Sequence, residues 1–83
     1  MKVCVIGLGT VGTPTIKYLH EEGVQTFGYD LVKKSIKGIE TYTDWKLVPQ
    51  PDIYVVIVYS SENVENVCRM ISEKDKDCLV SIE

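Results

Sequence analysis

Residues 2–12 read KVCVIGLGTVG, and this stretch decides how the rest of the chain is expected to fold. Lys2–Ile6 is a short apolar run rich in Val and Ile, which is typical of a strand buried on both faces of a parallel sheet. Three glycines follow, and apolar residues then recur at helical spacing over residues 10–22. Gly23 is expected to end this helix in a left-handed conformation. The stretch therefore predicts a strand, a tight glycine turn and a helix in immediate succession.

The rest of the chain continues this alternation of strands and helices. The other expected strands are residues 24–29, 40–43, 53–58 and 79–82, and the other expected helices are a poor one of two turns at 31–38 and a longer one at 62–73. Strands that alternate with helices imply a parallel sheet with right-handed crossovers. The sequence thus predicts an α/β fold, a doubly wound parallel sheet of the Rossmann type with about five strands in the order 3-2-1-4-5. A ligand is expected at the switch point between the first and fourth strands.

The glycines form a GxGxxG motif, Gly-Leu-Gly-Thr-Val-Gly at residues 7–12, which between a strand and a helix indicates a dinucleotide-binding site. Gly7 permits the turn out of the strand, Gly9 lets the pyrophosphate approach the backbone, and Gly12 allows the helix to pack closely. Backbone N–H groups near Thr10 and Val11 are then expected to face the phosphates at the positive end of the helix dipole. The alternative is a tight turn in a fold that binds no ligand.

Asp30 is expected to select the cofactor. It ends the second strand 18 residues after Gly12, close to the roughly 20 residues at which an acidic side chain meets the adenosine ribose. A carboxylate there accepts hydrogen bonds from the ribose hydroxyls and repels the 2′-phosphate of NADP, so the expected cofactor is NAD. Lys33 and Lys34 could partly compensate the negative charge of Asp30, so that a 2′-phosphate could bind. Lys34 is therefore also expected to be a cofactor-binding residue. The alternative for all three side chains is a solvated loop.

Two serines, Ser60 and Ser61, follow the fourth strand and flank the predicted ligand site. Their hydroxyls could reach the ribose or the pyrophosphate, and either could equally cap the helix that follows. No catalytic residue is expected in the chain. His20, the only histidine, lies on the first helix away from the glycine turn, and no cysteine has an activating base beside it.

Size and composition exclude several classes of protein. The 83 residues fit one domain, residues 1–83, and are too few for a complete two-substrate dehydrogenase, so we expect a part of a longer protein. The net charge is −3 with no basic stripe, so no nucleic-acid partner is expected. The longest apolar run, residues 53–59, is far shorter than the roughly 20 residues that span a membrane. Three cysteines outside any metal-binding pattern, and no signal peptide, predict a cytoplasmic protein without a metal site.

Residues 3–30, which contain VCVIGLGTVGTP and FGYD, resemble the NAD-binding domain of the UDP-glucose/GDP-mannose dehydrogenase family. In that family the segment typically reads VIGLGYVGLP and is followed by a strand that ends in G-x-D. Pro14 is the most telling match, because many other motifs of this type have no proline there. Residues 51–58 resemble the family's D-x-V-x-x-x-V-P strand, and residues 79–83 resemble the strand before its Ser-Thr pair.

The resemblance implies an oxidoreductase that converts a nucleotide-sugar alcohol into a carboxylate in two NAD-dependent steps. It implies that Gly7, Gly9, Gly12 and Asp30 hold the cofactor, that the catalytic residues lie beyond position 83, and that the parent protein forms a homodimer. The basic residue usually found five positions after the ribose carboxylate is here one position early, at Lys34. A second hypothesis is a nucleotide-sensing regulatory module without catalysis, as in the cytoplasmic domains that gate potassium transport.

Overall fold

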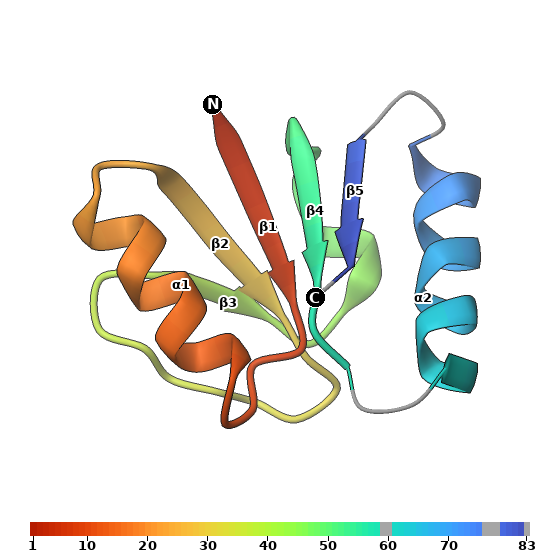
Figure 1. Cartoon of the computed structure of the whole chain (residues 1–83), viewed down its shortest axis with the longest axis horizontal. Helices are drawn as coiled ribbons and strands as arrows, with labels where there is room; N and C mark the ends of the chain where they lie inside the picture. Colours follow the sequence, from red (N-terminus) through yellow and green to blue (C-terminus); the bar gives the residue numbers. More distant parts are fainter. Residues whose placement is uncertain (59–60, 76–78, 83) are drawn as a thin grey trace.

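Five parallel strands form one sheet in the order β3-β2-β1-β4-β5 (Figure 1). The computed structural model describes residues 1–58, 61–75 and 79–82. Its elements are β1 (Lys2–Ile6), α1 (Gly12–Glu21), β2 (Gln25–Tyr29), β3 (Glu40–Tyr42), the 3₁₀ helix η1 (Trp45–Leu47), β4 (Ile53–Val56), α2 (Ser61–Lys74) and β5 (Leu79–Ile82). The predicted strand order is confirmed. Among the described residues, no helix combines the length and the apolar character needed to cross a membrane.

The two helices cover opposite faces of the sheet, which confirms the doubly wound arrangement. Successive side chains of a strand point to opposite faces, so the apolar run of β1 serves both. Val3 and Val5 pack in one cluster with Ile16 of α1. Cys4 and Ile6 pack in the other cluster, which includes Ile71 of α2. β1 is buried on both sides because it is the middle strand, and β4 lies inside the sheet between β1 and β5.

The segment between β3 and β4 shares its face of the sheet with α2. The ring of Trp45 lies 5.1 Å from that of Tyr29 and 5.9 Å from that of Tyr54, measured between centroids. The Lys74 amine, at the end of α2, donates hydrogen bonds to the carbonyl oxygens of Trp45 (2.6 Å) and Val48 (2.7 Å) and sits 4.6 Å from the Trp45 ring centroid. Burial lowers the pKa of Lys74. This side chain therefore ties the last turn of α2 to η1.

The end of α1 follows the expected glycine cap. Gly23 has a φ of +84°, and its N–H donates to the carbonyl of His20 at 3.1 Å. The N–H of Val24 reaches back to the carbonyl of Leu19 at 3.0 Å, which completes a Schellman motif. Because the cap takes up Val24, β2 begins one residue later than predicted.

Residues 31–38 do not form the predicted helix. The carboxylate of Asp30 accepts a hydrogen bond from the N–H of Val32 at 3.1 Å, a side-chain bond that competes with helix formation. Ile36 and Ile39 then form an antiparallel bridge, with Gly38 at a φ of +80° between them. Both isoleucines are buried against the α1 side of the sheet. The segment is thus an ordered loop, because local hydrogen bonds and two buried isoleucines outweigh a weak helix signal.

Candidate functional site

The first glycine of the motif is held between the ends of three strands. Gly7 has a φ of +97°, and its N–H donates to the carbonyl of Tyr29 at the end of β2 (2.9 Å). A Cβ atom at this position would lie 1.9 Å from the carbonyl oxygen of Ile57, just after β4. Only glycine satisfies both the backbone conformation and the space. The chain therefore turns sharply at the junction of β1, β2 and β4.

The third glycine sets how closely α1 approaches this turn. A Cβ atom on Gly12 would lie 1.7 Å from the carbonyl oxygen of Gly7. The start of α1 is thus in direct contact with the backbone at the end of β1. Gly12 was predicted to let the helix pack closely, and the geometry agrees with this role. The backbone that it approaches most closely is that of Gly7 in the glycine turn.

Backbone donors are exposed where α1 begins. Val11 is the N-cap residue, it provides no side-chain cap, and the first turn contains no acidic residue. The N–H of Thr13 donates to the carbonyl of Gly9 at 3.0 Å, as the first turn of the helix requires. In the described part of the chain, no hydrogen bond uses the N–H groups of Gly9, Thr10 or Val11. The positive end of the helix dipole and these donors are therefore available to an anion.

Asp30 lies beside the glycine turn and is bound to it. One carboxylate oxygen accepts a hydrogen bond from the N–H of Leu8 at 2.8 Å, and the other accepts the N–H of Val32. The backbone N–H of Asp30 donates to the carbonyl of Tyr42 on β3 at 3.1 Å. The side chain is half-buried, and each oxygen has a further lone pair for a ligand hydroxyl. The connection between Asp30 and Leu8 was not predicted from the sequence.

A cleft of about 740 Å³ opens between the glycine turn, the ends of β2 and β4, and α2. Its volume falls in the range of about 300–1,000 Å³ that is usual for small-molecule sites. Six residues predicted for the site line this cleft: Gly7, Gly9, Val11, Gly12, Asp30 and Lys34. Thr10 is exposed next to the cleft and does not line it. Ser60 lies outside the described residues, and Ser61 begins α2 with a side chain that is also outside them.

The α2 wall of the cleft was not predicted as part of the site. It consists of Asn63, Asn66, Val67 and Met70. These positions are three, four and seven residues after the first one, so they share one face of the helix. That spacing is present in the sequence, but only the folded chain brings this face of the helix beside the glycine turn.

The glycine turn brings backbone N–H donors and the Asp30 carboxylate to the cleft, and the α2 wall combines two asparagines with the apolar Val67 and Met70. Leu31 and Met70 line the cleft together with Tyr29. The pKa of Tyr29 is raised by burial and, to a lesser degree, by the carboxylates of Asp30 and Asp44. Its ring is therefore a neutral wall at physiological pH. Among the described residues, no group of three His, Cys, Asp or Glu side chains could hold a metal ion.

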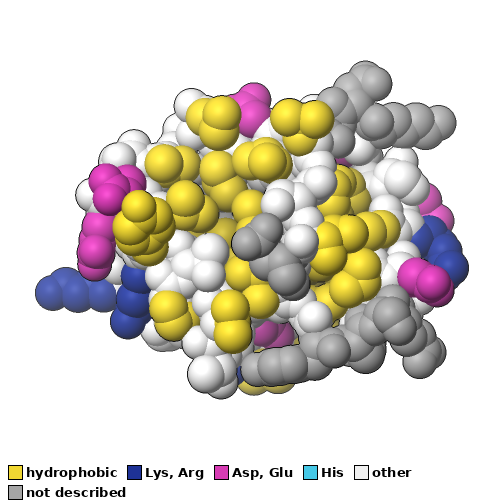
Figure 2. Space-filling view, in the orientation of Figure 1, with side chains coloured by type: hydrophobic (Ala, Val, Ile, Leu, Met, Phe, Trp, Pro, Cys, Tyr) yellow, Lys and Arg dark blue, Asp and Glu magenta, His cyan; other side chains and the backbone are white. Residues whose placement is uncertain are grey.

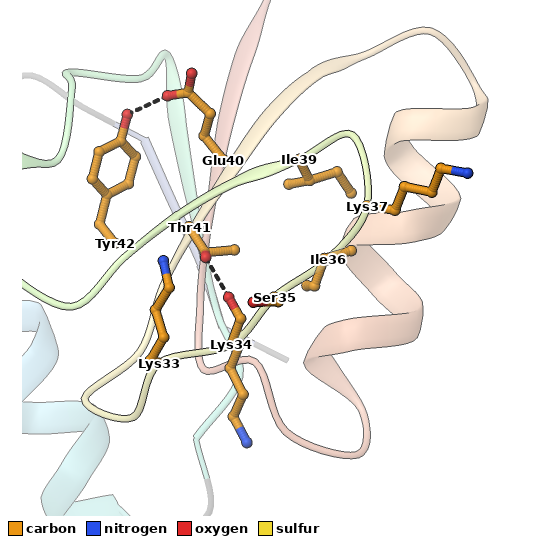
Figure 3. A pocket seen from close by; sticks show the side chains of 9 residues that line it. All are labelled: Lys33, Lys34, Ser35, Ile36, Lys37, Ile39, Glu40, Thr41 and Tyr42. Carbon is orange, nitrogen blue, oxygen red and sulfur yellow. Dashed lines mark hydrogen bonds between the residues drawn. The ribbon is translucent and has the colours of Figure 1, made fainter.

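A second hollow of about 610 Å³ lies on the loop before β3 (Figure 3). Residues 33–37 and 39–42 line it. The hydroxyl of Thr41 donates a hydrogen bond to the carbonyl of Lys34, and the Tyr42 hydroxyl donates to Glu40 at 2.7 Å. Lys34 borders both this hollow and the cleft.

The comparisons with known proteins find likeness to solved structures of dehydrogenases. No protein-family model matches the chain, and the comparison with curated proteins finds no match. A probable 2-hydroxyacid dehydrogenase from Rhizobium etli, solved with NADP, is 27% identical, with a TM-score of 0.65 over 75% of this chain and 21% of that one. UDP-D-ManNAc dehydrogenase from Pyrococcus horikoshii is 20% identical, with a TM-score of 0.79 over 100% of this chain and 28% of that one.

A short-chain dehydrogenase/reductase superfamily protein from Agrobacterium tumefaciens, solved with bound NAD, is 16% identical, with a TM-score of 0.73 over 99% of this chain and 32% of that one. The chain has a Rossmann-type α/β fold. It spans between about a fifth and a third of the length of these three proteins. The likeness therefore concerns the part of each protein that contains this fold.

Proposed function

We propose that the chain is the dinucleotide-binding domain of an NAD-dependent oxidoreductase. One observation carries this proposal: the uncapped start of α1 and the carboxylate of Asp30 face the same cleft, joined by the Leu8 hydrogen bond. The N–H of Val11, which lines the cleft, and the N–H of Thr10 next to it would hold the pyrophosphate. The free lone pairs of Asp30 would accept the hydroxyls of the adenosine ribose. When bound, the nicotinamide ring would supply hydride chemistry.

The residues of the cleft fit such a group. A dinucleotide needs donors for its phosphates, an acceptor for its ribose and apolar walls for its base. The glycine turn has the backbone donors, Asp30 has the acceptor, and Leu31, Val67 and Met70 are apolar walls. Structural neighbours solved with NADP and with NAD support the same class of ligand.

For the whole protein, we extend this proposal to an oxidoreductase of nucleotide sugars. The supporting features are Pro14, which lies in the exposed first turn of α1, and the GxGxxGxP pattern that it completes. The likeness to UDP-D-ManNAc dehydrogenase extends over the full chain and agrees with this proposal at the level of the fold. A nucleotide-sugar substrate would be held by the parent protein together with this domain.

Calorimetric titration of the purified protein with NAD tests the domain assignment. We expect saturable binding in wild type and none in Gly9→Val, because a branched side chain would occupy the approach of the pyrophosphate. Gly9 is not among the residues with positive φ, so its backbone does not lie in the left-handed region that requires glycine. The circular dichroism spectrum should remain that of wild type. Unchanged NAD binding in Gly9→Val would show that the glycines only form a turn.

A further inference from the structure

We propose that Lys34 allows the cleft to accept dinucleotides with a 2′-phosphate, so that NADP binds in addition to NAD. This inference rests on the proposed dinucleotide function and specifies the ligand of the same site further. Asp30 alone would repel a phosphate on the adenosine ribose. A cation in the same cleft changes that balance, and Lys34 is such a cation.

Lys34 lines the cleft together with Asp30. It is half-buried, and among the described residues its ammonium group takes part in no ion pair or hydrogen bond. Its charge is therefore available to a ligand, because no carboxylate of the described residues forms an ion pair with it. The Asp30 carboxylate, in contrast, already accepts the N–H groups of Leu8 and Val32. These two donors partly compensate its negative charge, which reduces its repulsion of a phosphate.

The loop conformation singles out Lys34 among three lysines. In the predicted helix, residues 33, 34 and 37 would have lain near one another on the surface. In the loop, the three amines point in different directions (Figure 3). Lys33 and Lys37 line only the second hollow, whereas Lys34 also reaches the cleft. The other two lysines are therefore natural controls for its charge.

The position of Lys34 relative to Asp30 is fixed through β3. The Thr41 hydroxyl holds the backbone carbonyl of Lys34, and the carbonyl of Tyr42 holds the backbone N–H of Asp30. Thr41 and Tyr42 are consecutive residues of one strand, so the backbone segments that carry Asp30 and Lys34 are both bound to β3. Thr41 is thus a positioning residue for the backbone of Lys34, whose side chain lines the same cleft as Asp30.

Titration of four proteins with NAD and with NADP tests the inference. The proteins are wild type, Lys34→Ala, Lys33→Ala and Thr41→Val, each with its fold checked by circular dichroism. In Lys34→Ala we expect NADP affinity to fall about fivefold to tenfold and NAD affinity to change by less than about twofold, because one charge-assisted bond to phosphate is lost. Lys33→Ala should change neither affinity. Thr41→Val should lower the NADP affinity relative to that for NAD, in the same direction as Lys34→Ala but less.

The effect should also shrink at high salt, because the ammonium group is only half-buried. Equal losses of NAD and NADP affinity in Lys34→Ala would place this lysine on the pyrophosphate and overturn the inference. So would unchanged NADP affinity in that variant, or a wild-type protein that binds NAD but not NADP. A wild-type protein that binds neither dinucleotide would overturn the proposed function itself, which the NAD titration distinguishes.

Discussion

The Asp30 side chain both lines the cleft and holds the backbone of the glycine turn. Its carboxylate faces the cleft, where a ribose would bind, and it also holds the N–H of Leu8 inside the glycine turn. The side chain that we propose to bind the ribose therefore also orders the glycine turn. Substitutions at this position should affect binding and stability together, and the two effects can be separated by the choice of variant.

Asp30→Ala should lower NAD affinity by about tenfold or more and cost about 1–3 kcal/mol of unfolding free energy, because charged acceptors are lost at both the ribose and the loop. Asp30→Asn keeps one oxygen acceptor and should lower the free energy of unfolding less than Asp30→Ala does. Because Asn has no charge, this variant should also reduce the difference in affinity between NAD and NADP. Calorimetry and urea unfolding measure the two effects. Unchanged NAD affinity in Asp30→Ala would contradict the assignment of this side chain to the ribose.

At the scale of elements, Lys74 binds the end of α2 to η1 through two hydrogen bonds, in addition to the apolar packing between the two segments. Lys74→Met keeps an apolar stem of similar length but removes two hydrogen bonds and the contact with the Trp45 ring. We expect a loss of about 1–2 kcal/mol in urea unfolding, after allowance for solvent screening at a side chain that remains exposed.

Lys46→Met is the matched control for this prediction. Lys46 lies in η1 itself, is exposed, and no hydrogen bond in the described part of the chain uses its amine. Its replacement should change the unfolding free energy by no more than about 0.5 kcal/mol, as is usual for surface positions. Equal effects of the two substitutions would show that the Lys74 bonds contribute nothing to stability.

The elements with a regular pattern of apolar residues could be predicted from the sequence. The apolar run of β1 and the glycine cap at Gly23 follow directly from local chemistry, and the strand order follows from the alternation of elements. The loop 31–38 was predicted wrongly, since its structure depends on a side-chain bond from Asp30 and on a bridge between Ile36 and Ile39. The α2 wall of the cleft was missed because only the folded chain brings residues near 30 and near 66 together.

At the scale of the whole molecule, hydrophobic side chains remain exposed over β5 and its neighbourhood. Leu79 is 69% exposed, Ile82 is 54% exposed and Val80 is 41% exposed. Hydrophobic side chains also gather across the face turned to the viewer in Figure 2. β5 is an edge strand, and its four residues contain neither a charge nor a proline that would discourage pairing with another strand.

We therefore expect the purified protein to self-associate as its concentration rises, because exposed apolar edge strands favour contact between molecules. Leu79→Glu should reduce this association and leave the fold intact, since the side chain is already largely in solvent. Ser72→Glu adds the same charge on the exposed surface of α2 and should have little effect. Sedimentation velocity over a range of concentrations measures the difference. An equal reduction of association in both variants would show that net charge, and not the β5 edge, controls it. Unchanged association in Leu79→Glu would show that the β5 edge is not the contact.

Trp45 is the only tryptophan of the chain, and its ring rests against Tyr29, which forms part of the cleft. The indole also has the Lys74 ammonium group next to it, a charge that moves away when α2 separates from the sheet. The protein consequently contains its own optical reporter. Its fluorescence should change in one way when a ligand enters beside Tyr29 and in another when the chain unfolds, so occupancy and stability can both be followed on unlabelled material.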